Sequence, residues 1–425
     1  MFAPDLVVRS RRVATERGMR AAAIHVRSEK IVGVLDFDDV PTACPLDDAG
    51  DAVILPGVVD THVHACGSDE ADFAAVTRAA AAGGVTTIVD MPFPGPSVTS
   101  LSALEAKWQA ADRRSHVDVG FWAGLLSTNV RELPRLFEAG ALGFYCSLLD
   151  SSPAAFPAVS DTDLRAAMPV LTHMGAALLV HAELAQAGAQ RWPSRWRSYA
   201  AYLDRQPKTL ENEAIASLVQ SCRDFRTRTH IVHLSSSDAL APLFHARLAR
   251  LPISAETCPH FLYFAAEDIR GTGAAFRWTP PIRGRENREL LWAAVVNGLI
   301  GPIVSGGRTP VGLSLAIMWT AAHMRGCTLE QLAKWMCRAP AELAGLTRKG
   351  RIDVGYDADL IVFGADAEFV VEPSAFPDGS AIPYAGQRLR GLVERTYLRG
   401  ALVYSRNRGW TSQKCRGKLI GRGTS

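Results

Sequence analysis

From residue 53 to residue 306 the chain alternates short apolar runs with segments of helical periodicity, and no other feature constrains its fold as strongly. Apolar runs that alternate with helices are typical of βα units around a parallel sheet. Eight such runs predict an α/β fold with a TIM-like (β/α)8 barrel, in which chemistry sits at the C-terminal strand ends. The predicted strands are 53–64, 85–91, 118–125, 141–148, 176–183, 228–235, 252–259 and 301–306.

Helical periodicity marks the segments between these strands, and several of them begin at Asp or Ser and stop at Gly. The predicted helices are 70–82, 101–114, 129–139, 161–173, 211–222, 238–250 and 287–299, with two more at 313–323 and 329–337.

The two ends of the chain are β-like. Three short β-like runs precede residue 53, and similar runs return after residue 345, ending in a hairpin around Arg399 and Gly400. We expect residues 1–52 and 346–405 to form one small β-sandwich domain, beside a barrel domain of residues 53–345. Residues 406–425 are predicted to be a poorly ordered tail whose basic side chains are solvated.

Composition narrows the class of protein. The 425 residues carry 46 Lys and Arg against 43 Asp and Glu, a net charge of +3 that favours neither nucleic acid nor a membrane surface as a partner. The N-terminus lacks a signal-peptide pattern, and no apolar run is long enough for a membrane span. The eight cysteines are scattered without a Cys-x-x-Cys pair. The sequence therefore predicts a cytoplasmic protein with reduced thiols.

Two histidines one residue apart, His62 and His64, end the first predicted strand. Alternate residues of a strand point to the same face, so both imidazoles can reach one point. His181 and His233 end two later strands and would lie at the same barrel mouth. Four neutral imidazoles suit Zn²⁺, so these residues are predicted metal ligands. The alternative is that they are packed, hydrogen-bonded residues that hold no ion.

Several motifs together resemble the amidohydrolase superfamily, and within it allantoinases, beside dihydroorotases and hydantoinases. The likeness extends from about residue 5 to about residue 405. It is carried by Pro-Gly-Val-Val-Asp-Thr-His-Val-His at 56–64, Ala-Gly-Gly-Val-Thr-Thr-Ile-Val-Asp-Met-Pro at 82–92, Gly-Ala-Leu-Gly-Phe at 140–144, His-Ala-Glu at 181–183, His-Ile-Val-His-Leu-Ser at 230–235 and Glu-Thr-Cys-Pro-His at 256–260.

The resemblance implies a two-metal site that hydrolyses a cyclic amide. His62 and His64 would hold one metal and His181 and His233 the other, with a carbamylated lysine as the bridge and an aspartate as general base. The chain departs from this pattern at both anionic positions, because Tyr145 stands where the lysine belongs and Gly306 where the aspartate belongs. None of the seven lysines lies at the C-terminus of a predicted strand. We therefore expect at most one Zn²⁺.

Other residues keep two interpretations each. Tyr145 either fills the space of the absent bridge or ligates a metal or donates a hydrogen bond, and the first is favoured. Asp60 and Glu183 either orient the ligand histidines or bond locally. His260 and Cys258 are predicted to line the substrate pocket. Only solvent or a displaced carboxylate such as Asp150 or Asp238 remains as a general base. The loop after strand one is shorter than usual and lacks an expected arginine, and a lid after strand eight is missing, which predicts a remodelled mouth.

The favoured hypothesis is an enzyme that acts on the C–N bond of a small cyclic amide or ureide at a histidine-only metal site. It would open the ring, or close it in reverse, and would form a homo-oligomer. The alternative is a catalytically inactive allantoinase-like or dihydroorotase-like pseudoenzyme that serves as a scaffold or regulatory subunit. A third possibility is metal-free ligand binding at the same mouth.

Overall fold

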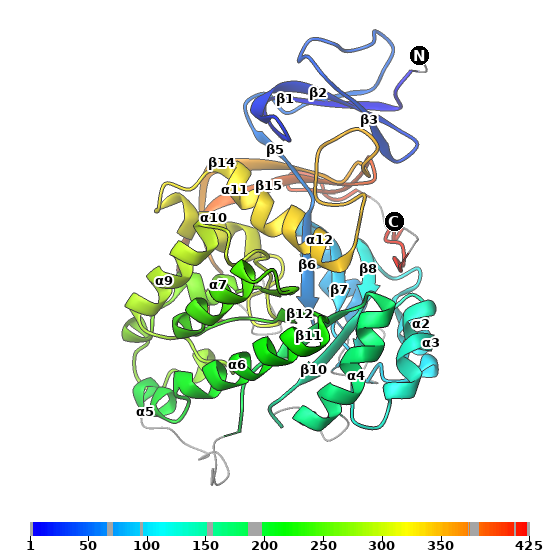
Figure 1. Ribbon diagram of the computed structural model, residues 1–425. Coiled ribbons are helices and arrows are strands. Elements are labelled where there is room, and N and C mark those ends of the chain that lie inside the picture. Colours follow the sequence, from blue (N-terminus) through cyan, green and yellow to red (C-terminus); the bar gives the residue numbers. More distant parts are fainter. Residues whose placement is uncertain are drawn as a thin grey trace. The chain divides into compact units, whose positions relative to one another are not determined.

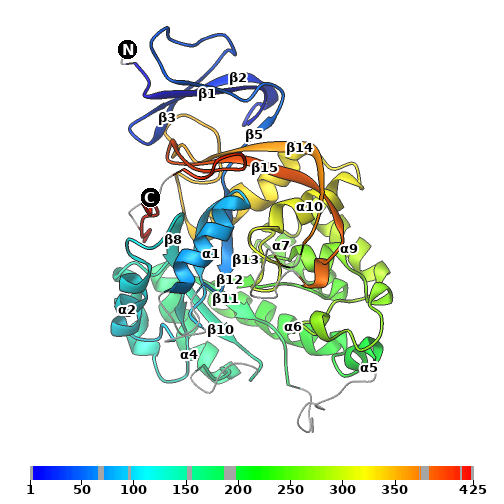
Figure 2. The same cartoon turned by 180° about the vertical axis from the view of Figure 1, so that it is seen from behind.

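The computed structural model describes residues 3–65, 71–93, 97–150, 156–185, 198–372, 374, 382–411 and 414–422 (Figures 1 and 2). The chain divides into two compact units. The first unit comprises Met1–Asp90, Trp108–Gly120 and Pro310–Ser425, and the second unit comprises Met91–Lys107 and Phe121–Thr309.

A nine-stranded sheet in the first unit joins the two ends of the chain, as the sequence predicts. Its order is β17-β16-β15-β14-β5-β1-β2-β3, with β4 paired to β1. The pairing of β5 with both β1 and β14 places N- and C-terminal strands in one layer. The limits of the two domains stay a prediction. The strands are β1 (Leu6–Thr15), β2 (Gly18–Arg27), β3 (Lys30–Leu35), β4 (Leu46–Asp48), β5 (Val53–Pro56), β14 (Leu360–Val370), β15 (Arg388–Leu398), β16 (Ala401–Ser405) and β17 (Gly409–Trp410).

The predicted hairpin connects β15 to β16 through Arg399 and Gly400. Both residues have positive φ angles, 47° and 77°, as a two-residue turn between twisted strands requires. Gly400 has a second constraint, because a Cβ there would lie 2.6 Å from Cγ1 of Val26. The hairpin is thus specified both by its local backbone and by close packing against β2.

The predicted strand 53–64 is wrong as a single element, since the chain switches sheets at Gly57. Residues before it form β5, antiparallel to β14, and residues after it form β6 (Val58–Val63), parallel to β7 (Val85–Asp90). A Cβ at Gly57 would overlap the side chain of Thr86, so only glycine permits the switch. β6 and β7 form a three-stranded sheet with β8 (Asp118–Phe121).

The C-terminal segment is not the free tail that the sequence predicts. Leu419 forms a parallel bridge with Val119 of β8, and the amide of Ile420 donates to the carbonyl of Val119 at 2.9 Å. Lys418 bonds Asp118 through its amide and Glu29 through its Nζ. Part of the basic cluster is therefore docked along a strand.

Two helices of the first unit, α1 (Ala71–Ala82) and α10 (Ser314–His323), agree with the predicted segments to within a few residues. The predicted helix 329–337 continues from α11 (Leu329–Ala333) into a π-helical turn, Lys334–Arg338. The short helix α12 (Ala339–Ala344) was not predicted.

The second unit contains a five-stranded sheet of order β13-β12-β11-β10-β9, with parallel pairing throughout. Its strands are β9 (Ala123–Gly124), β10 (Phe144–Ser147), β11 (Ala177–His181), β12 (Arg228–Ile231) and β13 (Ile253–Ala255). The predicted strand 301–306 is reduced to one bridge, between Ile303 and Thr257. The helices are α2 (Leu101–Ala111), α3 (Leu133–Glu138), α4 (Asp161–Met174), α5 (Tyr199–Asp204), α6 (Lys208–Phe225), α7 (Leu240–Leu248), α8 (Pro259–Tyr263) and α9 (Arg285–Val296). Two short helices of this unit were not predicted, α5 and α8, and α8 begins at Pro259, the last residue of the predicted strand 252–259.

Within the described ranges, no helix is long and apolar enough to cross a membrane. The seven cysteines that these ranges include are all free thiols.

Candidate active site

Parallel pairing of β11 with β12 brings two of the predicted ligands together. Ala177 pairs with Arg228 and Val180 with Ile231, so His181 and His233 emerge at the same edge of the sheet. Nδ1 of His181 lies 3.0 Å from Nε2 of His233, and both rings are buried. His233 has a φ of 40°, a conformation in which a non-glycine residue is uncommon and which clusters at functional sites.

Glu183 lies on the other side of the His181 ring. Its Oε2 is 3.5 Å from Nε2 of His181, and its side chain is 2% exposed. A carboxylate that accepts a hydrogen bond from the second nitrogen of a histidine fixes the orientation of the ring. Neither Nε2 of His181 nor Oε2 of Glu183 has a hydrogen-bond partner at this separation, so both interpretations of Glu183 stay predictions.

The separation of the two nitrogens fits a pair of metal ligands. Zn–N bonds are about 2.0–2.1 Å, so two nitrogens on one tetrahedral ion lie roughly 3.3 Å apart. The His181–His233 pair needs only a slight opening to reach that value. Among the described residues, however, no group of three His, Cys, Asp or Glu side chains is arranged to hold an ion. The pair thus fits two ligands of a metal, with the rest of the coordination shell unspecified.

The other predicted pair, His62 and His64, ends β6 in the first unit. The two ring centroids are 5.7 Å apart. Asp60 Oδ1 accepts a hydrogen bond from the backbone amide of His62 at 3.1 Å, which is the local interpretation of that residue. Asp90, at the end of β7, accepts from the amide of Ala65 at 2.7 Å and anchors the chain just after His64.

Tyr145 lies within an aromatic cluster in the second unit. Its ring centroid is 5.5 Å from that of Phe93 and 5.7 Å from that of Phe156, and the residue is 3% exposed. Burial, with smaller effects from Cys146 and Glu256, raises the pKa of the Tyr145 phenol well above its usual range. Tyr145 therefore stays neutral and cannot supply the negative charge that a bridging carbamate would bring.

Gly306 is backed by Cys258. Gly306 has a φ of 64°, and a Cβ there would collide with Sγ of Cys258 and lie 3.7 Å from Cε1 of His260. Thr309 Oγ1 lies 3.0 Å from Nδ1 of His260 and fixes that ring. The two predicted substrate residues, Cys258 and His260, thus lie together beside Gly306. In this backbone conformation the position has no room for an aspartate.

Lys107 lies on α2, not at the end of a strand, but its buried side chain extends to β7, where Nζ donates at 2.8 Å to the carbonyl of Met91, the residue after that strand. Of the candidate displaced bases, Asp238 accepts a hydrogen bond from Lys208 at 2.7 Å, which lowers the pKa of that carboxyl and weakens it as a base. Asp150 is exposed.

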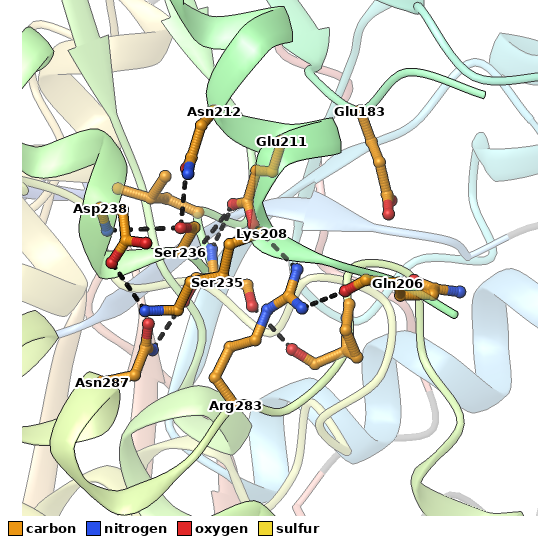
Figure 3. Close-up of polar contacts among 12 residues, drawn as sticks. Glu183, Gln206, Lys208, Glu211, Asn212, Ser235, Ser236, Asp238, Arg283 and Asn287 are labelled. Carbon is orange, nitrogen blue, oxygen red and sulfur yellow. Dashed lines mark hydrogen bonds and ion pairs between the residues drawn. The ribbon is translucent and has the colours of Figure 1, made fainter. Parts of the chain in front are cut away.

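A buried charge network in the second unit was not anticipated from the sequence (Figure 3). Oε1 of Glu211, on α6, accepts from the amides of Ser235 and Ser236 at 2.7 and 3.0 Å, two and three residues after His233. Arg283 lies 3.6 Å from Glu211 and donates to the carbonyl of Gln206. Burial raises the pKa of Glu211, against the lowering effects of Arg283 and the two amides. No short-range pattern links these residues, because they are separated by up to 77 positions.

Glu256, the residue after β13, is a second buried carboxylate that accepts a backbone hydrogen bond near His233. Its Oε2 lies 3.1 Å from Nε2 of His230, whose Nδ1 lies 2.8 Å from Oγ of Ser254. Its Oε1 accepts from the amide of His233 at 3.4 Å. Two buried carboxylates thus fix the backbone on either side of His233.

Comparison with known proteins identifies the class to which this fold and site belong. The amidohydrolase family model matches residues 53–400. An allantoinase of Streptomyces avermitilis is 39% identical over 427 residues, covering 94% of this chain and 95% of that protein. An allantoinase of Arabidopsis thaliana is 35% identical over 445 residues, covering 93% of this chain and 87% of that protein. The chain therefore belongs to the amidohydrolase family.

Solved structures give the same result for the fold. L-Hydantoinase (dihydropyrimidinase) from Arthrobacter aurescens matches with a TM-score of 0.89 at 28% identity, covering 99% of this chain and 100% of that one. Dihydropyrimidinase from Brevibacillus agri matches with a TM-score of 0.86 at 23% identity, covering 97% and 98%. The predicted α/β fold, a TIM-like (β/α)8 barrel with a small β-sandwich domain, is thereby confirmed.

Proposed function

We propose that the protein is an allantoinase-like enzyme that acts on the C–N bond of a cyclic amide or ureide at a metal site built from histidines alone. The observation that carries this proposal is the buried pair of His181 and His233, with Glu183 beside His181. The 39% identity to an allantoinase over nearly the whole chain supports the substrate class. Cytoplasmic location and a homo-oligomeric state are parts of the same proposal.

His181 and His233, and in the first unit His62 and His64, would hold the metal, which when bound supplies a Lewis acid and a water of lowered pKa. Other residues of the chain would hold these histidines and the substrate-pocket residues in position. Glu183 places a carboxylate 3.5 Å from the His181 ring, and Glu211 and Glu256 hold the backbone around His233. Thr309 orients His260 at the predicted substrate pocket. Cys258, fully buried behind Gly306, shapes the pocket.

The test is a substrate screen in both directions of the reaction. Allantoin, hydantoin, dihydrouracil and dihydroorotate, with their ring-opened ureido acids, are incubated with the metal-loaded parent and with the His62→Ala and His181→Ala variants. We expect turnover of at least one ring by the parent and its loss in both variants. His245→Ala is the matched control, because His245 is an exposed histidine of α7. Thermal melting checks that each variant is folded.

The second candidate is the inactive pseudoenzyme, serving as a scaffold or regulatory subunit. Gly306 and Tyr145 favour it, because neither the base nor an anionic bridge can be provided at these positions. Losing a base from a catalytic constellation costs several powers of ten in rate. If the parent is no faster than the His62→Ala variant on every compound, the enzyme proposal fails and the pseudoenzyme stands.

A further inference from the structure

We propose that the phenol of Tyr145 donates a hydrogen bond to a ring carbonyl of the substrate, so that this residue binds the ligand and does not only fill space. The inference rests on the proposed function, because it concerns the ligand of the same site. It adds the residue that recognises the substrate and the chemical group on the ring that is recognised.

The direction of the Tyr145 side chain follows from its neighbour on β10. The ring of Phe144 lies 6.2 Å from the ring of Phe137 on α3, so Phe144 faces that helix. Successive residues of a strand point to opposite faces of the sheet. Tyr145 therefore points to the face of the sheet that is turned away from α3.

The pairing of β10 with β11 places His181 on the same face as Tyr145. Tyr145 pairs with Leu179, and Ser147 pairs with His181 two residues further along both strands. Neighbouring strands lie about 4.8 Å apart and rise about 3.3 Å per residue, so the Cα atoms of Tyr145 and His181 are roughly 8 Å apart. Tyr145 is thus a diagonal neighbour of a predicted metal ligand.

The aromatic neighbours of Tyr145 show that its ring lies at the C-terminal end of the strands. Phe93 follows the last residue of β7 by three positions, and Phe156 follows the last residue of β10 by nine. Their ring centroids lie 5.5 and 5.7 Å from that of Tyr145. In a (β/α)8 barrel this end of the strands forms the face that binds the substrate.

The hydroxyl of Tyr145 forms no hydrogen bond with any residue that the structure describes, although Tyr145 is only 3% exposed. Two other buried tyrosines of the same unit differ, because Tyr199 donates to the carbonyl of Ile282 at 3.0 Å and Tyr202 to that of Trp278 at 2.6 Å. A buried phenol usually has a partner, since burial removes its hydrogen bonds to water. At the substrate face, a ligand can provide the acceptor.

The phenol of Tyr145 is suited to donate a proton in a hydrogen bond and unsuited to act as a base. Burial raises the pKa of Tyr145 well above its usual range, so the hydroxyl keeps its proton. A cyclic ureide offers carbonyl oxygens as acceptors, and negative charge develops on the oxygen of the amide that is attacked. A fixed donor stabilises this developing charge more than the neutral carbonyl, so Tyr145 contributes more to the rate than to the affinity.

The test compares Tyr145→Phe with Tyr199→Phe, because each substitution removes one buried hydroxyl and keeps the ring. Affinities of the metal-loaded proteins for hydantoin, 2-thiohydantoin and 4-thiohydantoin are measured by isothermal titration calorimetry. Sulfur is a weak acceptor, so replacing the contacted oxygen by sulfur removes the bond to the phenol. The metal is present in every protein, so its own preference for sulfur cancels when a variant is compared with the parent.

We expect Tyr145→Phe to weaken hydantoin binding about 3-fold to 10-fold and to leave the affinity for one of the two thio compounds unchanged. That compound identifies the ring carbonyl that the phenol contacts. For any ring that the parent turns over, kcat should fall about 100-fold to 1,000-fold in Tyr145→Phe, with a much smaller change in KM.

Thermal melting separates this role from a structural one. Tyr199→Phe should lower the melting temperature and keep the affinities of the parent, because it leaves the carbonyl of Ile282 without its donor. Tyr145→Phe should keep the melting temperature of the parent, because the lost hydroxyl has no partner among the described residues.

Equal effects of Tyr145→Phe on all three compounds, no effect on any of them, a lowered melting temperature, or no binding of hydantoin by the parent would overturn the proposal. The calorimetry does not require turnover. A selective loss of affinity in a protein that turns over no compound would refute the proposed function alone, and turnover that is unchanged in Tyr145→Phe would refute this inference alone.

Discussion

Replacing Lys349 by Met should destabilise the first unit severely. Nζ of Lys349 lies 2.6 Å from Asp118, 2.7 Å from Asp359 and 3.0 Å from Asp357, and its side chain is 1% exposed. Burial lowers the pKa of Lys349, but the three carboxylates outweigh it and raise that pKa far above its usual range. The ammonium therefore stays charged throughout the range in which the protein is handled, and it is the central cation of the cluster.

The expected magnitude follows from what the substitution leaves behind. Removing one partner of a buried ion pair costs about 3–5 kcal/mol, because the other charge stays buried without compensation. Arg399 still contacts Asp118, so Asp357 and Asp359 bear most of the loss. Against a total stability of about 5–15 kcal/mol, this corresponds to a fall in melting temperature on the order of 10 °C.

Thermal unfolding of Lys349→Met beside Lys30→Met is the assay. Lys30 is an exposed lysine at the start of β3, so its loss should change stability by no more than about 0.5 kcal/mol. In Lys349→Met, Asp359 loses the cation that opposes the effect of burial, so its pKa in the folded state should rise further above the unfolded value. Folding would then bind protons, and the defect should shrink as the pH falls from 8 to 5.

Equal melting temperatures for Lys349→Met and Lys30→Met would refute this reasoning. So would a defect that grows as the pH falls, because it would mean that the carboxylates stay ionised without Lys349.

Three further outcomes are expected. Gly306→Ala should lower stability by roughly 1–3 kcal/mol, and Cys258→Ala should restore part of the loss, since the added Cβ meets Cys258; additive effects in the thermal melts would contradict this contact. Arg283→Met should destabilise by about 3–5 kcal/mol and Arg223→Met by little, because only the first leaves Glu211 buried without its cation; equal melting temperatures would contradict the pairing. Elemental analysis of metal-loaded protein should find at most one ion per chain, and Tyr145→Lys alone should not restore hydrolysis because Gly306 still lacks a base; two ions in the parent, or a rescued activity, would refute our account of these positions.

Local patterns were sufficient for much of the fold. The alternation of apolar runs and helical segments predicted β10 to β13 and the long helices between them, since β10 and β11 are buried along their whole length and β12 along most of it. The hairpin at Arg399 and Gly400 was predictable because its turn chemistry resides in two adjacent residues.

The fold predictions were wrong where the local structure depends on residues that are distant in sequence. The switch at Gly57 depends on Thr86, and the docking of the C-terminal segment depends on Val119, three hundred positions away in sequence. The strand predicted at 301–306 has the right composition, yet pairs only at Ile303, because the loop at Gly306 turns away beside Cys258. Such contacts leave no periodic signal in the residues on either side.

The residues of the candidate site also fall into those that local sequence patterns could predict and those that they could not. His181 and His233 could be assigned from their places at strand ends, and parallel register is enough to bring them together. The residues that hold them in place, Glu211 and Arg283, are buried charges on other elements. A buried charge must be paired, so each of these residues requires the other, and neither could be recognised before the fold supplied its partner.

The residue at position 306 decides whether the site has a general base where the family pattern places one. An aspartate there needs space for its Cβ, and Sγ of Cys258 occupies that space. The positive φ of 64° adds a smaller cost, because Asp tolerates this conformation better than most L residues. A reversion to aspartate alone would therefore clash before it could act as a base.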